Sequence, residues 1–225
     1  MERVLSFDFS ALKDQWWDPD GPMRPLHDMT PFRGNFIMDN CPKKPESAID
    51  FGCGAGILSE WLTEQGIKVK GIDSSQELID NANRHARLSG LNIEYACSNS
   101  IQEQKTKVDL IACMEVLEHC DNYEDLICTF AGKLNKGGTL CVSTINNTWE
   151  AFFKVILAAE YILNIVPKGT HQKNSFIKPS ELIRNAKKYR LELTAISGMA
   201  YQPYSRKCNK TDDLSSNYIA IFKKF

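Results

Sequence analysis

The stretch A-I-D-F-G-C-G-A-G-I, residues 48–57, decides the fold of this chain, and Asp73 follows it at the end of a second apolar run. An apolar strand places Asp50 near its carboxyl end. Three glycines then allow a sharp turn without Cβ atoms that would block a ligand; they are Gly52, Gly54 and Gly56. A helix that begins directly after the turn points its unpaired N–H groups at the same place. Asp73, at the tip of the next strand, can accept hydrogen bonds from both hydroxyls of a ribose. The pattern predicts a nucleotide-type cofactor site.

The spacing of the glycines narrows the kind of cofactor. A dinucleotide-binding loop usually reads G-x-G-x-x-G, and its helix N-terminus favours a pyrophosphate. Here the third glycine comes one residue early, and Asp50 precedes the first. That acid would repel a phosphate but suits a cationic cofactor that carries an amino group. The loop resembles motif I of class I S-adenosylmethionine-dependent methyltransferases, and Asp73 resembles their ribose-binding acid.

Composition limits the class of protein. A chain of 225 residues is long enough for one substantial α/β domain. The formal net charge of −1 provides no basic field for nucleic acid, so no nucleic-acid partner is expected. Eight cysteines without a C-x-x-C pair favour a reducing compartment over a disulfide framework or a zinc site. The N-terminus lacks the apolar core of a signal peptide. We therefore expect a cytoplasmic protein, most simply a bacterial one.

The order of apolar and polar segments predicts an α/β fold. A lead-in helix is expected over 7–17, followed by loops. From residue 48 strands and helices alternate, which indicates a parallel sheet covered on both faces. The expected strands are 48–51, 68–72, 92–96, 108–113 and 138–144, and the expected helices are 56–65, 76–89 and 122–134. Helices over 149–166 and 179–189 and strands near 191–200 and 217–223 complete the chain.

The ending resembles the antiparallel hairpin that finishes class I methyltransferase sheets. The predicted fold is therefore Rossmann-like, with a mostly parallel seven-stranded sheet, helices on both faces and this hairpin. Residues 1–45 are expected to form an N-terminal cap and residues 46–225 the methyltransferase domain. An apolar lid or membrane-interaction insertion is expected at 149–171.

A second group of polar residues follows the predicted strand 108–113. The segment reads M-E-V-L-E-H, residues 114–119. Met114 leaves the strand toward the cofactor cleft, where a thioether suits an adenine face. If the segment forms one helical turn, Glu115, Glu118 and His119 project to one side. They can then bind a divalent cation, or provide a general base without a metal. The absence of [DNS]-P-P-[YFW] here disfavours a DNA-adenine or protein-glutamine acceptor and favours an oxygen nucleophile.

Several longer segments make the resemblance more specific. They are W-W-D-P-D-G-P-M-R-P-L-H-D-M-T-P-F-R (16–33), C-M-E-V-L-E-H (113–119), A-E-Y-I-L-N-I-V-P-K-G-T-H (159–171) and F-I-K-P-S-E-L (176–182). Together with the glycine loop they resemble the ubiquinone-biosynthesis O-methyltransferase family, which acts on 2-polyprenyl-6-hydroxyphenol and 3-demethylubiquinol. The resemblance runs from about residue 7 to the C-terminus.

The resemblance implies roles for particular residues. The cofactor would be S-adenosylmethionine, held at Arg33, Gly52, Asp73 and Met114. A guanidinium at Arg33 suits the cofactor's carboxylate. A divalent cation, most plausibly Mg²⁺, would be held by Glu115, Glu118 and His119 and would lower the pKa of a catechol oxygen. Alternatively, His119 removes the proton directly.

A polyprenyl substrate requires a route to the membrane. The stretch 150–166 has an apolar surface but is too short and too charged to span a bilayer. With Trp149, Phe152 and Phe153 as anchors, the 149–171 segment can lie in the interface. Periodicity alone also fits a core or dimer helix. The resemblance favours peripheral association with the bacterial inner membrane, or with the matrix face of a mitochondrial membrane in a eukaryote, and contact with other ubiquinone-biosynthesis proteins.

Two rival functions remain at this stage. One is a methyltransferase for another small oxygen or carbon acceptor, which has no need of the apolar 149–171 segment. The other is a non-catalytic S-adenosylmethionine-fold scaffold within a quinone-synthesis complex. The intact glycines, both acids and the E-x-x-E-H group argue against the scaffold.

Overall fold

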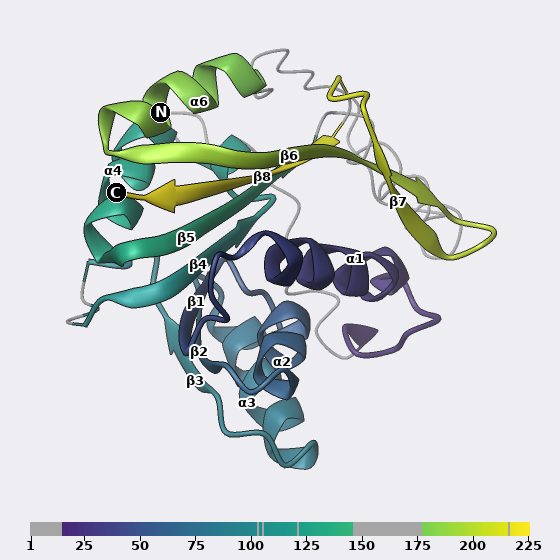
Figure 1. The fold of residues 1–225 in the computed structure, drawn as a ribbon. Coiled ribbons are helices and arrows are strands. Elements are labelled where there is room, and N and C mark those ends of the chain that lie inside the picture. The colour runs from purple at the N-terminus through teal and green to yellow at the C-terminus, as the bar shows by residue number, and fades with distance from the viewer. Residues whose placement is uncertain (1–14, 103, 105, 121, 146–176, 216) are drawn as a thin grey trace, which may run out of the picture.

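A single eight-stranded sheet organises the protein (Figure 1). The computed structural model describes residues 15–102, 104, 106–120, 122–145, 177–215 and 217–225. The strand order is β3-β2-β1-β4-β5-β8-β6-β7. Strands β3, β2, β1, β4 and β5 pair in parallel, while β8, β6 and β7 pair antiparallel. The sheet is thus mostly parallel and ends in an antiparallel section, as the sequence predicted.

The elements have the following bounds. The strands are β1 (Ser47–Phe51), β2 (Lys68–Asp73), β3 (Glu94–Cys97), β4 (Val108–Met114), β5 (Leu134–Ile145), β6 (Leu191–Gln202), β7 (Lys207–Thr211) and β8 (Asn217–Lys224). The helices are α1 (Arg24–Asn40), α2 (Ile57–Glu64), α3 (Gln76–Leu88), the short 3-10 helix η2 (Leu117–His119), α4 (Tyr123–Lys133) and α6 (Pro179–Lys188).

Helices cover the sheet on both faces, with α1, α2 and α3 on one side and α4 and α6 on the other (Figure 1). Phe130 of α4 and Leu182 of α6 are buried in one apolar cluster with Ile111 and Phe222 of the sheet. A second cluster packs Ile37 of α1 and other α1 and α2 side chains onto the opposite face. Burial of these apolar surfaces is the main source of stability for such a layered fold.

Local capping residues mark the boundaries of α3 and α4. The Ser75 hydroxyl caps α3 by accepting the N–H of Leu78, and Gly90 follows the helix with φ +69°. The Asn122 side chain caps α4 by accepting from the N–H groups of Glu124 and Asp125. Acids in that first turn also complement the helix dipole.

The prediction of loops between residue 17 and residue 45 was wrong, because α1 occupies 24–40. A proline near its start is compatible with a helix, but Pro31 lies inside it. The buried side of α1 includes the polar or small residues Thr30, Arg33 and Gly34. A Cβ on Gly34 would lie 2.4 Å from the Trp61 ring of α2, so the two helices pack closely. The buried face therefore lacks the apolar periodicity that reveals a helix.

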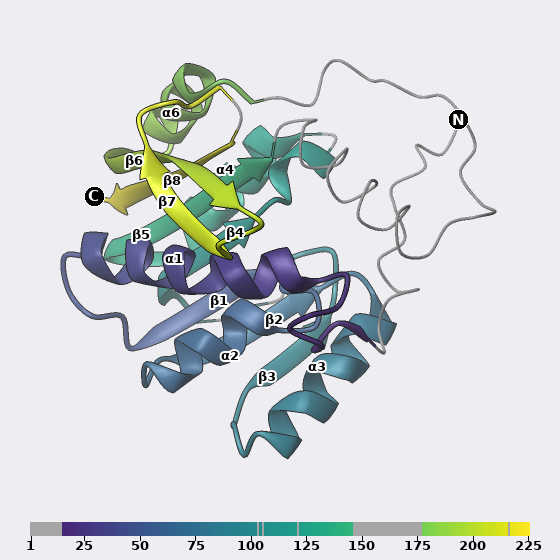
Figure 2. The ribbon, with the colours of Figure 1, turned by 90° about the vertical axis from the view of Figure 1, so that its right-hand side faces the viewer.

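The sheet also contains one strand more than the predicted seven. The extra strand, β7, pairs antiparallel with β6 at the sheet edge. Its sequence K-C-N-K-T carries no apolar alternation because an edge strand is largely exposed. Figure 2 shows the β6–β7 hairpin extending over α1. The predicted helix 149–166 and most of the predicted lead-in helix lie outside the described residues.

Candidate cofactor and active site

The ends of β1, β2 and β4 meet where the strand order changes direction. From β1 the chain runs to β2 on one side, while β4 pairs with β1 on the other. Ligands of open α/β sheets bind beyond the carboxyl ends of strands at such a switch point. The sequence-predicted acids and glycines all lie at this edge.

The glycine loop has a backbone that requires glycine. Gly52, Gly54 and Gly56 have φ values of +75°, +55° and +94°. A Cβ on Gly52 would lie 2.2 Å from Val116 Cγ2, and one on Gly56 would lie 2.2 Å from Tyr95 Oη. Positive φ and close packing together exclude larger residues from these positions. Gly56 is also the N-cap of α2, so the helix begins at the turn itself.

Asp73 links the glycine loop to the end of β2. Its Oδ2 accepts a 2.9 Å hydrogen bond from the Gly54 N–H, and its Oδ1 accepts one of 2.9 Å from the Ser75 N–H. A carboxylate oxygen has two lone pairs, so each oxygen retains capacity for a further donor. The arrangement fixes the orientation of the carboxylate and leaves it able to bind ribose hydroxyls.

Asp50 is a buried acid directly before the loop. Its residue is only 2% exposed, and its Oδ2 accepts a 2.6 Å hydrogen bond from the Ser59 hydroxyl. Burial raises the pKa of Asp50 to about 6; the Ser59 hydrogen bond opposes this, the charge of Asp73 adds to it, and Arg33 opposes it. A cationic ligand beside Asp50 would stabilise the ionised form of this buried carboxylate.

Arg33 and Glu115 form an ion pair at the same edge. Arg33 comes from α1 and is 4% exposed; its Nη2 donates to Oε1 of Glu115. The Ser143 hydroxyl of β5 donates to that oxygen at 2.6 Å. Among the described residues, Arg33 Nε has no hydrogen-bond partner although it is buried. Met114, the last residue of β4, is buried in the apolar cluster on the α1 and α2 side of the sheet.

Glu115, Glu118 and His119 are not brought together as a metal site. Glu118 and the exposed His119 lie in η2, whereas Glu115 precedes it and turns to Arg33 and Ser143. Across the part of the chain that the structure describes, no three His, Cys, Asp or Glu side chains are arranged to hold a metal ion. The donor set therefore does not fit the three-ligand cation site that the resemblance implied.

Aromatic residues before α1 cover the glycine loop. A Cβ on Gly54 would lie 2.6 Å from Trp16 Cζ2, so the indole packs on the loop backbone. Trp17 stacks on His85 of α3 with ring centroids 3.5 Å apart. The ring Nδ1 of His85 lies 2.8 Å from Oε1 of the buried Glu60 in α2. The segment before α1 therefore packs against the glycine loop and against α3, which is itself linked to α2.

The β6–β7 hairpin holds the same N-terminal segment from the other side. The Tyr201 hydroxyl donates to Asp28 at 2.6 Å, and Arg206 Nε donates to the second oxygen of Asp28 at 2.9 Å. Arg206 also pairs with Asp20 at 2.6 Å. These contacts join residues more than 170 positions apart in the chain, at separations of 173 and 178 residues for the two bonds to Asp28.

Known proteins with similar sequences identify the family of this chain. A family model described as a methyltransferase domain matches residues 27–196. The ubiquinone biosynthesis O-methyltransferase of Xylella fastidiosa strain 9a5c is 41% identical over 215 residues, which cover 94% of this chain and 87% of the relative. That of Coxiella burnetii strain RSA 331 is 40% identical over 216 residues, covering 95% and 92%. The chain belongs to the ubiquinone biosynthesis O-methyltransferase family.

Membership confirms the predicted activity class. The protein is an S-adenosylmethionine-dependent O-methyltransferase of ubiquinone biosynthesis. Solved structures agree on the fold of this family member. An S-adenosylmethionine-dependent methyltransferase from Clostridium acetobutylicum has a TM-score of 0.63 at 17% identity, over 96% of this chain and 97% of that one. A magnesium protoporphyrin IX methyltransferase from Synechocystis, solved with bound SAH, has a TM-score of 0.62 at 17% identity, over 100% and 90%.

The residues of this O-methyltransferase fit S-adenosylmethionine. The positive-φ glycines form a tight turn at the strand ends, and Asp73 retains acceptor capacity beside them. The buried Asp50 suits an ammonium group, and the buried Arg33 Nε lacks a partner among the described residues. The chain thus offers an acceptor for a ribose, an anion for an ammonium and a cation for a carboxylate.

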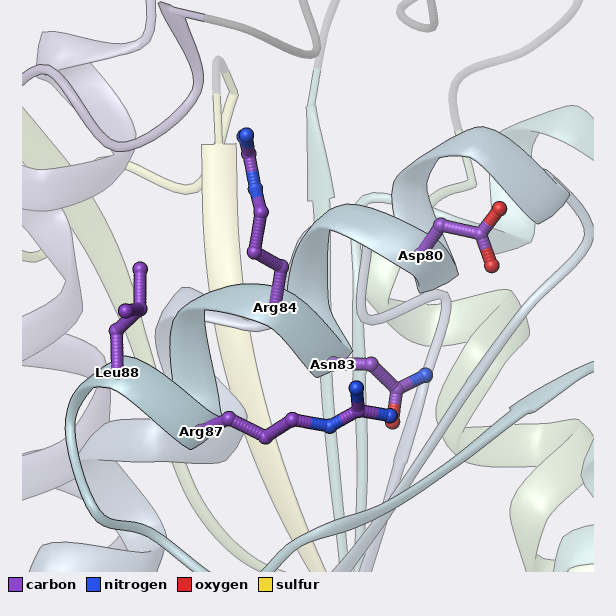
Figure 3. Close-up of a pocket in the computed structure, with 5 residues that line it drawn as sticks. All are labelled: Asp80, Asn83, Arg84, Arg87 and Leu88. Carbon is purple, nitrogen blue, oxygen red and sulfur yellow. The ribbon is translucent and has the colours of Figure 1, made fainter.

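A surface pocket elsewhere is unrelated to this site. Figure 3 shows its lining side chains, all of which belong to α3: Asp80, Asn83, Arg84, Arg87 and Leu88. None of them comes from the glycine loop or from a strand end.

Sequence reasoning missed two polar partners in the site. Ser59 lies in the first turn of α2 and binds Asp50, and Ser143 ends an apolar run in β5 and binds Glu115. A hydroxyl after the buried run 140–142 was a visible signal, since polar residues at the carboxyl ends of parallel strands tend to face ligands. The partner of Ser143 was not visible from the sequence.

Proposed function

We propose that the enzyme methylates a phenolic oxygen of catechol-type polyprenyl intermediates, namely 2-polyprenyl-6-hydroxyphenol and 3-demethylubiquinol. The support is the family membership together with the glycine loop between Asp50 and Asp73 at the sheet's switch point. The loop and its acids suit the cofactor, and the family to which the relatives belong indicates the pathway.

The proposed roles follow from the contacts at the strand ends. Asp73 binds the ribose, Asp50 the ammonium group and Arg33 the carboxylate of S-adenosylmethionine, while Met114 contacts the adenine. When bound, the cofactor supplies an electrophilic methyl carbon on a sulfonium. The phenolic oxygen forms a bond to that carbon as the carbon–sulfur bond breaks and S-adenosylhomocysteine leaves. The residues contribute mainly by holding the reacting groups in line.

The phenolic proton requires an acceptor, and we assign it to His119. The imidazole is exposed in η2, next to the end of β4. An imidazole can accept a proton near neutral pH, which suits it to act as a general base. No step is assigned to a divalent cation, because Glu115 is bound to Arg33 and Ser143.

Replacing His119 with alanine is expected to lower kcat on a catechol substrate by about 100-fold, since a positioned base contributes roughly that much or more. The dissociation constant for S-adenosylhomocysteine should not change. Steady-state kinetics and calorimetry measure the two effects, and added imidazole should restore part of the rate. An unaltered kcat would show that another group removes the proton.

Cofactor binding should depend on pH through Asp50. A cationic ligand favours the ionised carboxylate of Asp50. Below the pKa of about 6 that Asp50 has in the free enzyme, binding therefore has to release a proton, and affinity falls as the pH falls. Affinity for S-adenosylhomocysteine should therefore be about tenfold weaker at pH 5 than at pH 7. Calorimetry across this range measures it. Asp50→Asn should bind weakly with little slope; an equal slope in both proteins would contradict the assignment.

We also propose that the 149–171 segment contacts the membrane surface where the lipid substrate resides, because its sequence is apolar with flanking lysines. This segment lies outside the described residues. None of the helices that the structure describes combines the length and apolar character that a bilayer crossing requires. Flotation with anionic liposomes tests the proposal, and protein that stays in the dense fraction would contradict it.

The substrate assignment is tested by incubating purified enzyme with methyl-labelled S-adenosylmethionine and a short-chain demethylubiquinol analogue. The expected product carries one labelled methoxy group on the ring. A matched analogue whose phenolic oxygens are already methylated serves as the control and should remain unlabelled. Label on a carbon or nitrogen acceptor, or none on the catechol, would overturn the assignment.

A further inference from the structure

One carboxylate oxygen of Glu115 is bound by residues from two other elements. Its Oε1 accepts hydrogen bonds from Arg33 Nη2 of α1 and from the Ser143 hydroxyl of β5, the latter at 2.6 Å. Charge-assisted bonds of this kind are stronger than neutral ones. The oxygen thus bridges the helix and the sheet beside the glycine loop.

The backbone at Glu115 directs its side chain toward α1. The residue has φ +54°, a region that residues other than glycine adopt rarely. Its N–H donates to the carbonyl oxygen of Ser143 at 3.1 Å. Both the main chain and the side chain of Glu115 are therefore tied to one residue of β5. Uncommon backbone conformations held by surrounding contacts are concentrated at functional sites.

Arg33 requires such an anion. The residue is 4% exposed, and a buried guanidinium without a counter-charge is strongly unfavourable. Glu115 neutralises it through Nη2, while the buried Nε keeps no partner among the described residues. The pair thus combines a neutralised guanidinium with unused donor capacity at the edge where the cofactor site lies.

We infer that Glu115 is a positioning residue: it holds the Arg33 guanidinium so that the remaining N–H donors are available to the carboxylate of the cofactor's amino-acid part. The inference rests on the proposed function of Arg33 as the carboxylate clamp. It differs from the metal-ligand role that the resemblance implied for Glu115, because Oε1 already accepts from Arg33 and Ser143 and the carboxylate charge is paired with the Arg33 guanidinium.

The test compares two ligands that differ in the group Arg33 would bind. S-adenosylhomocysteine carries the amino-acid carboxylate, whereas 5′-methylthioadenosine lacks it. Glu115→Gln is expected to raise the calorimetric dissociation constant for S-adenosylhomocysteine by about tenfold. The dissociation constant for 5′-methylthioadenosine should not change. Glu118→Gln makes the same chemical change three residues later and should alter neither value.

A second variant covers the possibility that Glu115→Gln fails to fold. Ser143→Ala removes one hydrogen bond to the Glu115 carboxylate but keeps its charge. The dissociation constant for S-adenosylhomocysteine should therefore rise by a smaller factor, about threefold, and that for 5′-methylthioadenosine should not change. Circular dichroism and thermal melting establish that each variant is folded. The wild-type protein should bind S-adenosylhomocysteine with the same affinity in Mg²⁺ as in EDTA.

Three results would overturn the inference: equal weakening of both ligands by Glu115→Gln, no weakening of either, or Mg²⁺ binding that disappears in both Glu115→Gln and Glu118→Gln. A wild-type chain that binds neither ligand would instead overturn the proposed cofactor site. The two failures are therefore distinguishable.

Discussion

Replacing Gly52 with alanine should weaken S-adenosylmethionine binding by about 100-fold, which corresponds to about 2.8 kcal/mol of binding free energy. Two effects combine at this position. The backbone has φ +75°, where an alanine costs about 1–2 kcal/mol. The new Cβ would also lie 2.2 Å from Val116 Cγ2, so the loop or the segment after β4 must move. Both segments border the proposed cofactor site. Calorimetry with S-adenosylhomocysteine measures the loss.

Gly90→Ala provides a matched control. Gly90 has a similar φ of +69°, but a Cβ there meets no atom within 4 Å. The substitution carries the same backbone strain at the end of α3, away from the glycine loop. It should lower thermal stability slightly and leave the dissociation constant at the wild-type value. Equal weakening by both variants would mean that general destabilisation, not the loop, controls binding.

Replacing Asp73 with alanine should have an effect at least as large. The change removes the acceptor for two ribose hydroxyls, and each hydrogen bond to a charged group contributes about 1.5–3 kcal/mol. It also removes the acceptor for the N–H groups of Gly54 and Ser75, so the loop keeps only its backbone bonds to Ile72 of β2. Affinity for S-adenosylhomocysteine should fall by about 100-fold or more.

Asp109→Ala is the control for this prediction. Asp109 also accepts from two backbone N–H groups, those of Glu46 and Ser47, at 3.0 and 3.3 Å. It lies near the start of β4, whereas the cofactor site lies at the strand's other end. Its replacement should lower the melting temperature but leave the affinity for S-adenosylhomocysteine unchanged. Retained affinity in Asp73→Ala would contradict the ribose assignment.

Features encoded by neighbouring residues were predictable from the sequence. The glycine loop with Asp50 and Asp73 was located correctly because strand, turn and helix signals follow one another within 26 residues, 48–73. The parallel strands and the helices α3 and α4 follow from local patterns in the same way. These signals require no knowledge of distant contacts.

Features created by distant residues were not predictable. Helix α1 buries Arg33, a charged residue that the sequence alone would place at the surface. Its partner, Glu115, lies 82 residues further along the chain and reaches it only in the folded protein. The same pair removed Glu115 from the expected group with Glu118 and His119. The edge strand β7 is held by pairing with β6 and, through Arg206, by ion pairs with Asp20 and Asp28. Tertiary contacts override local pattern at such positions.

A crystal structure of the enzyme with S-adenosylhomocysteine tests the proposed cofactor site most directly. We expect the ligand at the carboxyl ends of β1, β2 and β4, with its ribose hydroxyls on Asp73 and its carboxylate on Arg33, which remains paired with Glu115. Ligand bound away from the glycine loop, or bound there with Glu115 turned from Arg33 to a metal ion, would contradict it.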